Sequence, residues 1–295
     1  MAEPTRRRIG VLGASSGTGT CLLESLAGGD SAIIAYSRSP ARQQAPNHGH
    51  WEQATSLLTP GHRFIDPVAG WVSVAPLWTL PQYLPAIRAS GARALVAVSS
   101  TSAEAKRDAH DPAEQEMARR LLEAESTLLD WSDREGVDCT ILRPTLVHGL
   151  GRDRNITVIA DVIRRFGVFP LLGRGTGLRQ PLHATDLARA CTLALEHPGH
   201  LAGVHTVTGA ETLTYRTMVT HVFEAMGKPP RFLPVPRRVA RGLLPVARLH
   251  PRWRHVTPGM LERMNRDLAF QQSAALEALG YSPSAFRPLL QELSP

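Results

Sequence analysis

The sequence predicts an α/β protein, in which a doubly wound parallel sheet carries helices on both faces and is followed by a smaller, mainly helical C-terminal lobe. Short apolar runs alternate with helical patterns through the first two-thirds of the 295 residues, which favours a parallel sheet. The first run leads into a glycine-rich turn that opens a helical pattern, and after Gly209 the chain becomes helical and rich in proline. We therefore expect a first domain over residues 1–208 and a second lobe over residues 209–295, a division that the chain length allows.

The elements follow in order from these patterns. Apolar runs of strand length predict strands over residues 9–12, 32–36, 70–75, 94–99 and 138–142. Apolar residues at helical spacing predict helices over residues 81–90 and 112–135. One face of the longer helix carries Met117, Leu121, Ala124 and Leu128. Residues 44–61 show the least periodicity, so the sequence places no strand there.

The turn after the first strand predicts a dinucleotide site. Its glycines have separate tasks: Gly13 permits the tight turn, Gly17 lets the backbone approach a pyrophosphate, and Gly19 lets helix and strand pack closely. The start of the helix offers unpaired N–H groups and a positive dipole end to phosphates. The alternative is a structural turn without a ligand. We expect cofactor contacts from the whole turn: Gly13, Ser15, Ser16, Gly17, Thr18 and Gly19.

The end of the second strand indicates which dinucleotide binds. An acidic residue at this point binds the ribose of NAD, whereas an arginine accommodates the extra phosphate of NADP. The strand ends at Ser37 and Arg38, with no carboxylate after it. This favours NADP, with NAD as the alternative and with a solvent-exposed arginine as the alternative for Arg38.

Composition narrows the class of protein. The share of hydrophobic residues, 43%, and of charged residues, 20%, is ordinary for a globular chain. Cys21, Cys139 and Cys191 lie far apart in apolar patterns without metal-ligand spacing, so we expect reduced core residues in a cytoplasmic protein and no metal. The chain has no run of about eighteen apolar residues, so we expect no transmembrane segment.

The net charge of +7 comes from one segment. Residues 225–261 hold eight of the 33 basic residues and no acidic one, which leaves 25 basic against 26 acidic residues elsewhere. We therefore expect no nucleic-acid-binding surface. Leucines interleave with these arginines, so peripheral membrane contact is an alternative to a solvated face of the small lobe. The sequence also leaves a homodimer open.

Three later stretches, together with the glycine turn, resemble the short-chain dehydrogenase/reductase superfamily, in particular its extended and atypical branch, the NAD-dependent epimerase/dehydratase family. The stretches are Val98-Ser99-Ser100-Thr101, Leu142-Arg143-Pro144-Thr145-Leu146-Val147-His148-Gly149 and the segment 179–188. The resemblance covers roughly residues 8–225. It implies a Rossmann fold with a substrate lobe. At the strand ends we expect further cofactor contacts from Ala75, Ser99, Pro144 and Thr145.

The chemistry of that family rests on a tyrosine, a lysine four residues later and a serine or threonine. A lysine at this spacing lowers the tyrosine pKa, so that the phenol exchanges a proton with substrate. No Tyr-x-x-x-Lys occurs in this chain, and Met117 and Leu121 fill the two slots in our alignment. We expect both side chains beside the nicotinamide-ribose pocket. Thr101 remains as the candidate catalytic hydroxyl, and His148 or His110 as the substitute proton-transfer group.

Two functions follow. The first is an NAD(P)-binding oxidoreductase or epimerase-like enzyme that acts by hydride transfer on a nucleotide-sugar-like or other small hydroxyl or carbonyl substrate. Arginines that suit a sugar-nucleotide diphosphate are Arg152, Arg154 and Arg179. The alternative is a non-catalytic NADP-binding regulatory protein that has lost the tyrosine and the lysine.

Overall fold

The computed structural model describes residues 7–39, 49–109, 111–153, 155–236 and 264–293. The chain forms two compact units. The first contains Met1–Pro144, Ala184–Val207 and Gln272–Ser282, and the second contains Thr145–His183, Thr208–Gln271 and Pro283–Pro295. Most of the basic segment, and with it the suggested membrane contact, lies outside the described residues.

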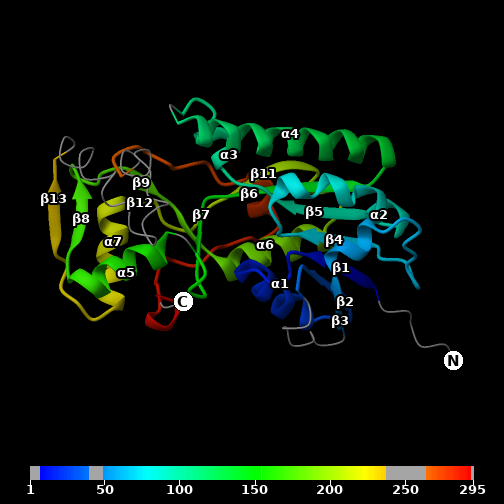
Figure 1. The fold of residues 1–295 in the computed structure, drawn as a ribbon, viewed down its shortest axis with the longest axis horizontal. Coiled ribbons are helices and arrows are strands. Elements are labelled where there is room, and N and C mark those ends of the chain that lie inside the picture. The colour runs from blue at the N-terminus through cyan, green and yellow to red at the C-terminus, as the bar shows by residue number, and fades with distance from the viewer. Residues whose placement is uncertain (1–6, 40–48, 110, 154, 237–263, 294–295) are drawn as a thin grey trace. The chain divides into compact units, whose positions relative to one another are not determined.

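The first unit is built on a seven-stranded sheet in the order β11-β6-β5-β4-β1-β2-β3 (Figure 1). All of its neighbouring strands are parallel. The strand order reverses between β1 and β4, which is the point where ligands bind in doubly wound sheets. The predicted fold class is therefore confirmed. The strands are β1 Arg8–Leu12, β2 Ala32–Ser37, β3 Gly49–Gln53, β4 Gly70–Ser73, β5 Ala94–Val98, β6 Asp138–Pro144 and β11 Gly203–Val207.

Helices cover both faces of this sheet. On one face lie α1 Gly17–Ala27 and α6 Ala184–Glu196, and on the other lie α2 Leu84–Ala89, α3 Ser102–Ala105 and α4 Pro112–Glu135 (Figure 1). The other helical pieces among the described residues of this unit are η2 Ala54–Leu58, η3 Leu77–Thr79, η4 Pro81–Tyr83 and α10 Ala274–Ala278. The predicted helix over residues 81–90 is thus a 3-10 turn that continues into α2.

Helix α4 has the predicted bounds because both of its ends are specified locally. Asp111 Oδ1 accepts a hydrogen bond from Ala113 N at 2.9 Å, and Gly136 ends the helix in the left-handed conformation, with φ 64°. The buried stripe includes Leu121 and Leu128, as expected. Met117, which shares this face in the sequence pattern, is 40% exposed. It lies at the border of the stripe, one position before buried Ala118.

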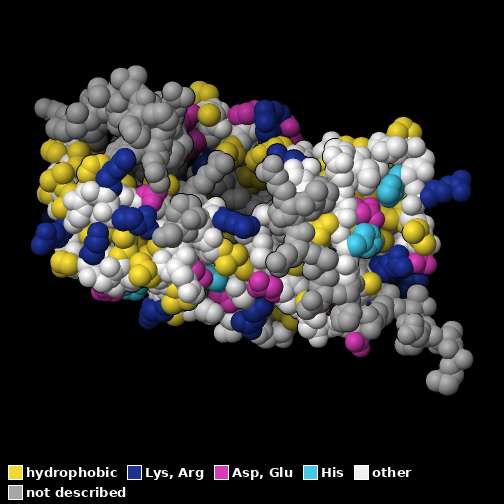
Figure 2. All heavy atoms as spheres, turned by 60° about the horizontal axis from the view of Figure 1, so that its bottom comes forward, with side chains coloured by type: hydrophobic (Ala, Val, Ile, Leu, Met, Phe, Trp, Pro, Cys, Tyr) yellow, Lys and Arg dark blue, Asp and Glu magenta, His cyan; other side chains and the backbone are white. Residues whose placement is uncertain are grey.

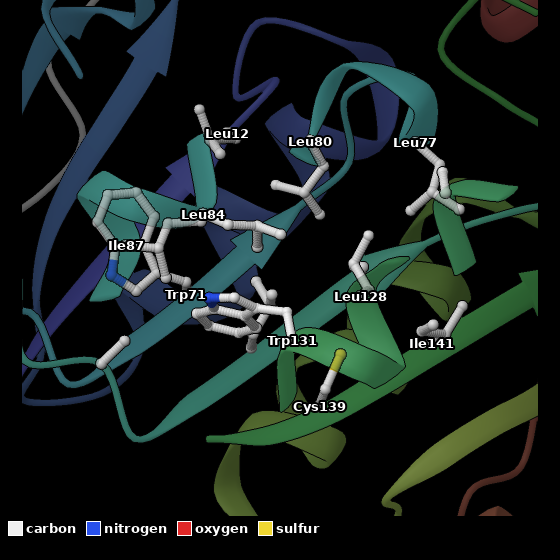
Figure 3. Close-up of a cluster of buried hydrophobic side chains, with 14 of the residues drawn as sticks. Leu12, Trp71, Leu77, Leu80, Leu84, Ile87, Leu128, Trp131, Cys139 and Ile141 are labelled. Carbon is white, nitrogen blue, oxygen red and sulfur yellow. The ribbon is translucent and has the colours of Figure 1, made fainter. Parts of the chain in front are cut away.

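The core between the sheet and α4 is shown in Figure 3. Leu128 and Trp131 of α4 pack over Trp71 of β4 and Ile141 of β6. Trp71 is fully buried, and the ring of Tyr36 stacks on it at 5.4 Å. All three cysteines are buried and none forms a disulfide, as expected of core thiols.

The second unit has its own core and three small two-stranded sheets. In the part of this unit that the structure describes, the helices are α5 Ile156–Phe166 and α7 Tyr215–Ala225, with the short η6 Leu290–Leu293. Its strand pairs are β7 Leu146–His148 with β10 Pro181–His183, β8 Phe169–Leu172 with β13 Phe232–Val235, and β9 Leu178–Arg179 with β12 Leu213–Thr214.

The division of the chain differs from the expected boundary at residue 208. Residues 145–183 belong to the second unit, because the chain leaves the main sheet after β6 and pairs in small sheets there. Residues 272–282 return to the first unit, where Ser273 N donates to Thr206 O at 3.1 Å. The C-terminal third therefore contributes to both units.

On the face that Figure 2 shows, Lys and Arg side chains are scattered among acidic and hydrophobic ones, without a continuous patch of one sign among the described residues. No helix in the described part of the chain is long and apolar enough to cross a membrane.

Candidate dinucleotide site and its surroundings

The turn between β1 and α1 requires glycine at two positions. Gly13 has φ +78°, and a Cβ built on it would lie 2.6 Å from Ala75 N. A Cβ on Gly19 would lie 2.5 Å from the carbonyl oxygens of Gly13 and Ala14. The turn therefore brings Gly13 against Ala75, which follows β4, and α1 against the end of β1. These close approaches explain why the sequence pattern has glycine at position 13, for the tight turn, and at position 19, for close packing of helix and strand.

The N-terminus of α1 is suited to bind an anion. Ser16 is the N-cap, and its Oγ accepts a hydrogen bond from Gly19 N at 3.0 Å. The N–H groups of Gly17 and Thr18 belong to the first turn, where no helical carbonyl is available to them. The first turn holds no acidic residue. Together the cap, the N–H groups and the helix dipole suit the pyrophosphate of a dinucleotide.

Serines join the turn to the end of β2. Ser37 Oγ donates to Ser15 Oγ at 3.1 Å and accepts from Ser39 N at 3.2 Å. Arg38 is exposed between these serines. Glu52, a carboxylate of β3 that the sequence pattern did not single out, lies in register with Tyr36, and its Oε1 lies 2.9 Å from His50 Nε2. Because β3 is an edge strand with little burial, its sequence gave no strand signal that could have placed Glu52 here.

The ends of β5 and β6 are joined through the backbone. Ser99 N donates to Leu142 O at 2.7 Å, and Thr101 N donates to Pro144 O at 3.1 Å. Thr101 Oγ1 donates to the same carbonyl at 3.1 Å, and the residue is only 8% exposed. The structure thus brings Ser99, Thr101 and Pro144 together at the carboxyl edge of the sheet. Thr145, the next expected contact, belongs to the second unit and donates its hydroxyl to Gln180 O at 2.6 Å.

A buried charge network, which no sequence motif indicated, lies beside these residues. Glu125 of α4 is 3% exposed, and its carboxylate accepts hydrogen bonds from the Ser99 hydroxyl and the Arg143 guanidinium. Arg143 also forms an ion pair with Glu104 of α3. The Glu125 carboxylate, with a smaller contribution from Glu104, raises the pKa of Arg143. A charged residue on the apolar stripe of α4 was the signal in the sequence.

The two slots of the missing tyrosine and lysine have different surroundings. Leu121 is 4% exposed and belongs to the hydrophobic core of the first unit. Its expected place beside the nicotinamide-ribose pocket stays a prediction. Met117 is exposed, and its Sδ lies 3.7 Å from Lys106 Nζ. Lys106 also lies 3.9 Å from Glu114. Met117, which fills one of the two slots, thus has the ammonium group of Lys106 next to it, and Lys106 lies in the segment that precedes α4.

His148 is buried in the second unit. Its ring lies 5.2 Å from that of His183 and 4.9 Å from that of Phe286, both edge to face. Burial, with a smaller effect of nearby His183, lowers the pKa of His148 to about 3. The imidazole is therefore neutral at physiological pH, so it does not act there as an imidazolium acid. The other candidate, His110, lies outside the described residues.

The arginines that were expected to bind a substrate diphosphate differ in how far they are buried. Arg179 is buried, donates to Arg266 O at 2.9 Å and stacks on Tyr215 at 5.5 Å, so it serves the second unit's packing. This corrects its expected role toward a substrate. Arg152 is exposed, and Arg154 lies outside the described residues. Among the side chains that the structure describes, no group of three or more His, Cys, Asp or Glu could hold a metal ion.

Comparison with known proteins finds a family match for one stretch of the chain. Residues 82–207 match the model of the NAD dependent epimerase/dehydratase family, so the expected resemblance is confirmed over this stretch. The matched stretch begins after the β1–α1 turn and includes β5, α4 and β6.

Two curated proteins are similar to parts of the chain. Uncharacterized protein y4nG of Sinorhizobium fredii is 30% identical over 176 residues, which is 59% of this chain and 43% of that protein. Subunit 9 of the NADH dehydrogenase (ubiquinone) 1 alpha subcomplex from Arabidopsis thaliana mitochondria is 26% identical over 107 residues, 36% of this chain and 26% of that protein. The chain thus spans less than half the length of either relative.

Solved structures of epimerases share the fold. UDP-glucuronic acid 4-epimerase from Bacillus cereus, in complex with UDP-glucuronic acid and NAD, has a TM-score of 0.69 at 15% identity, over 95% of both chains. UDP-glucose 4-epimerase from Thermotoga maritima, with UDP-glucose, has a TM-score of 0.65 at 16% identity, over 95% of this chain and 94% of that one. The NAD complex of the Thermus thermophilus enzyme has a TM-score of 0.59 at 20% identity, over 78% and 86%.

Proposed function

We propose that this protein is an NAD(P)-dependent enzyme of the epimerase/dehydratase type, which acts by hydride transfer on a nucleotide-sugar-like or other small hydroxyl or carbonyl substrate. The observation that carries the proposal is the β1–α1 turn, where Gly13 and Gly19 leave no room for a side chain and Ser16 caps α1. The family match over residues 82–207 supports the reaction class. The UDP-sugars held by the similar epimerases support the substrate class.

We propose NADP as the cofactor and NAD as the alternative. Arg38 and the two serines beside it offer a cation and hydroxyl groups to a phosphate on the adenosine ribose. No carboxylate follows Arg38 within the described part of this loop. The family description and the similar epimerases point to NAD instead. The two cofactors differ by the one phosphate that Arg38 would contact.

Each part of the site has a task in this proposal. When bound, the nicotinamide supplies a hydride acceptor and donor. The N–H groups of Gly17 and Thr18 would hold the diphosphate, and Ser15 and Ser37, which are hydrogen-bonded to each other, would offer hydroxyl groups to the adenosine ribose. The hydroxyl segment 99–101, at the carboxyl end of β5, holds the substrate oxygen. We assign no proton-donating step to His148, because it stays neutral.

Fluorescence titration with NADPH and NADH tests the cofactor proposal. We expect NADPH to bind more tightly, and Arg38→Ala to weaken NADPH binding about tenfold or more, the scale of one charge-assisted hydrogen bond. NADH affinity should stay the same. Arg134→Ala, at an exposed position of α4, is the matched control. Absence of binding by either nucleotide would overturn the proposed function, and equal affinities would overturn the role of Arg38.

A second candidate is a non-catalytic NADP-binding protein. It is favoured by buried Leu121 in one slot of the catalytic pair and by the neutral state of His148. It is also favoured by the similarity to a subunit of a mitochondrial NADH dehydrogenase. The two candidates differ in turnover: incubation with NADP⁺ or NAD⁺ and UDP-glucose, UDP-galactose or UDP-glucuronic acid should give a new sugar nucleotide only if the protein is an enzyme.

A further inference from the structure

The end of α5 carries an exposed aromatic side chain next to basic ones. The buried face of this helix includes Ile159 and Ile163, and Phe166 follows on the same face, three residues after Ile163. Phe166 is nevertheless 53% exposed, and the two residues before it, Arg164 and Arg165, are exposed as well. The core of the second unit therefore leaves half of the last aromatic side chain of α5 in contact with solvent.

Strand β13 starts beside this end of α5. Phe169 follows Phe166 by three residues, and its N–H donates to Arg231 O at 2.8 Å. Arg231 is exposed, and Leu233, two residues later on β13, is 54% exposed. Two large apolar side chains thus lie near the start of the β8–β13 pair, each within two residues of an exposed arginine.

Further basic side chains lie nearby. The guanidinium of Arg216, an exposed residue of α7, lies over the ring of Phe232, 4.3 Å from its centroid. Lys228 Nζ donates to Ile163 O, in the last turn of α5, at 3.4 Å. We call the whole the basic–apolar surface of the second unit, and it consists of Phe166, Leu233, Arg165, Arg216, Lys228 and Arg231.

The two segments that supply most of this surface, residues 162–172 and 225–236, carry no acidic residue. Asp161 and Glu224 flank them, and Asp161 is paired with Arg164 at 2.5 Å. Figure 2 shows Lys and Arg side chains between hydrophobic ones over the part of the molecule where Figure 1 places β8 and β13. The basic–apolar surface therefore suits a partner that is anionic and that also offers hydrocarbon.

An anionic bilayer meets both requirements. Its phosphate groups accept hydrogen bonds from guanidinium groups, and the boundary of its acyl chains takes up aromatic and aliphatic side chains. An arginine keeps its charged end among the headgroups while its stem lies against hydrocarbon. A nucleic acid offers phosphates to the same arginines but no apolar phase to Leu233, so the exposed leucine favours lipid.

We propose that the basic–apolar surface binds an anionic phospholipid bilayer, with Phe166 and Leu233 at the acyl-chain boundary and the basic side chains at the lipid phosphates. The contact is peripheral and reversible, because two apolar side chains bury too little surface to hold the protein without the charges. It is a second activity, separate from the dinucleotide site, and it does not rest on hydride transfer.

Co-sedimentation of the full-length protein with phospholipid vesicles tests the inference. We expect binding to vesicles that contain phosphatidylserine, no binding to vesicles of phosphatidylcholine alone, and release at about 1 M salt, where charges are screened beyond about 3 Å. Arg165→Ala with Arg231→Ala should weaken binding about tenfold or more, because each basic side chain near an anionic surface contributes to affinity. Phe166→Ser with Leu233→Ser should weaken it by a similar factor. Leu233→Ser alone is the second variant if the double serine variant unfolds.

Matched changes in the first unit are the controls. Ile65→Ser alters a side chain that is 94% exposed, and Arg93→Ala with Arg134→Ala removes two exposed arginines. Both should bind vesicles as the wild type does. All variants should keep the melting temperature and the NADPH affinity of the wild type, and if the wild type binds no NADPH, the proposed function fails while the membrane inference stands.

The remaining outcomes contradict the inference. Equal binding to both kinds of vesicle, binding to neither, or an equal loss in the controls would overturn it. Loss in the arginine variant alone would mean a purely electrostatic attraction without contact to acyl chains. Displacement from the vesicles by double-stranded DNA, which the serine variant binds as tightly as the wild type, would identify a nucleic acid as the partner and refute the lipid.

Discussion

At the scale of single residues, the β1–α1 turn depends on the absence of a side chain where the backbone approaches itself. Gly13 needs this for its positive φ and for its contact with Ala75, and Gly19 needs it because two carbonyl oxygens lie where a Cβ would be. The sequence pattern predicted both requirements, since a glycine turn between a strand and a helix has few other reasons to exist.

Gly19→Ala should therefore disturb the turn more than an alanine ordinarily disturbs a helix. We expect a loss of about 1–3 kcal/mol in the free energy of unfolding, the cost of overpacking, and weaker NADPH binding. Urea titration and fluorescence titration measure the two effects. Gly28→Ala is the control, because its Cβ would meet only Ser25 O at 3.9 Å and its φ of −73° suits alanine. Similar results for the two variants would contradict the close approach at Gly19.

The protonation state of His148 depends on its tertiary environment and not on its position in a sequence motif. The sequence places it at the end of a short strand, where a ligand-facing side chain is expected. Its environment is instead made by residues distant in the chain, His183 and Phe286, which the motif does not mention. Burial by such contacts is a tertiary property, and it decides the protonation state.

The depressed pKa of His148 predicts a loss of stability in acid. The unfolded chain binds a proton at this residue near pH 6.5, whereas the folded chain does so only near pH 3. Stability is therefore full above pH 6.5 and falls, by up to about 1.4 kcal/mol per pH unit, as the pH drops toward 3. In His148→Phe, the difference in unfolding free energy between pH 7 and pH 5 should be smaller than in the wild type. The control is His200→Phe at an exposed position, and an unchanged difference in His148→Phe would refute the assignment.

At the scale of elements, the sequence predicted those whose limits are specified locally. Helix α4 is bounded by Asp111, Pro112 and Gly136, so its limits could be read from the sequence. The edge strand β3 is held by one neighbour and shows little burial, so no alternation of apolar and polar residues marks it. The division into units was missed because residues 145–183 and 272–282 are assigned by contacts between distant segments.

Arg143 connects three elements of the first unit, since its guanidinium on β6 binds Glu125 of α4 and Glu104 of α3. Glu125→Ala should destabilise the protein by about 3–5 kcal/mol, because it leaves a partly buried arginine without its main partner. Glu104→Ala removes only the exposed arm of the network and should cost less than about 1 kcal/mol. Thermal or urea unfolding of both variants measures this contrast. Equal costs would mean that burial does not distinguish the two carboxylates.

At the scale of the whole molecule, the chain contains a seven-stranded parallel sheet whose order reverses between β1 and β4, next to the glycine turn. The residues expected to contact a dinucleotide mostly belong to the first unit, which collects Gly13, Ser37, Ala75, Ser99 and Pro144. Thr145 and His148 belong to the second unit. We therefore expect the cofactor to bind mainly to residues of the first unit, at the edge of its sheet.

The central claim is that a dinucleotide binds across the β1–α1 turn. Hydrogen–deuterium exchange with and without saturating NADPH tests it most directly, because the exchanging groups are the backbone N–H groups assigned to the phosphates. The account predicts slower exchange in residues 13–20 and 37–39, with a smaller effect in residues 99–101. Slower exchange confined to other segments, or no change at a concentration that saturates the protein, would contradict it.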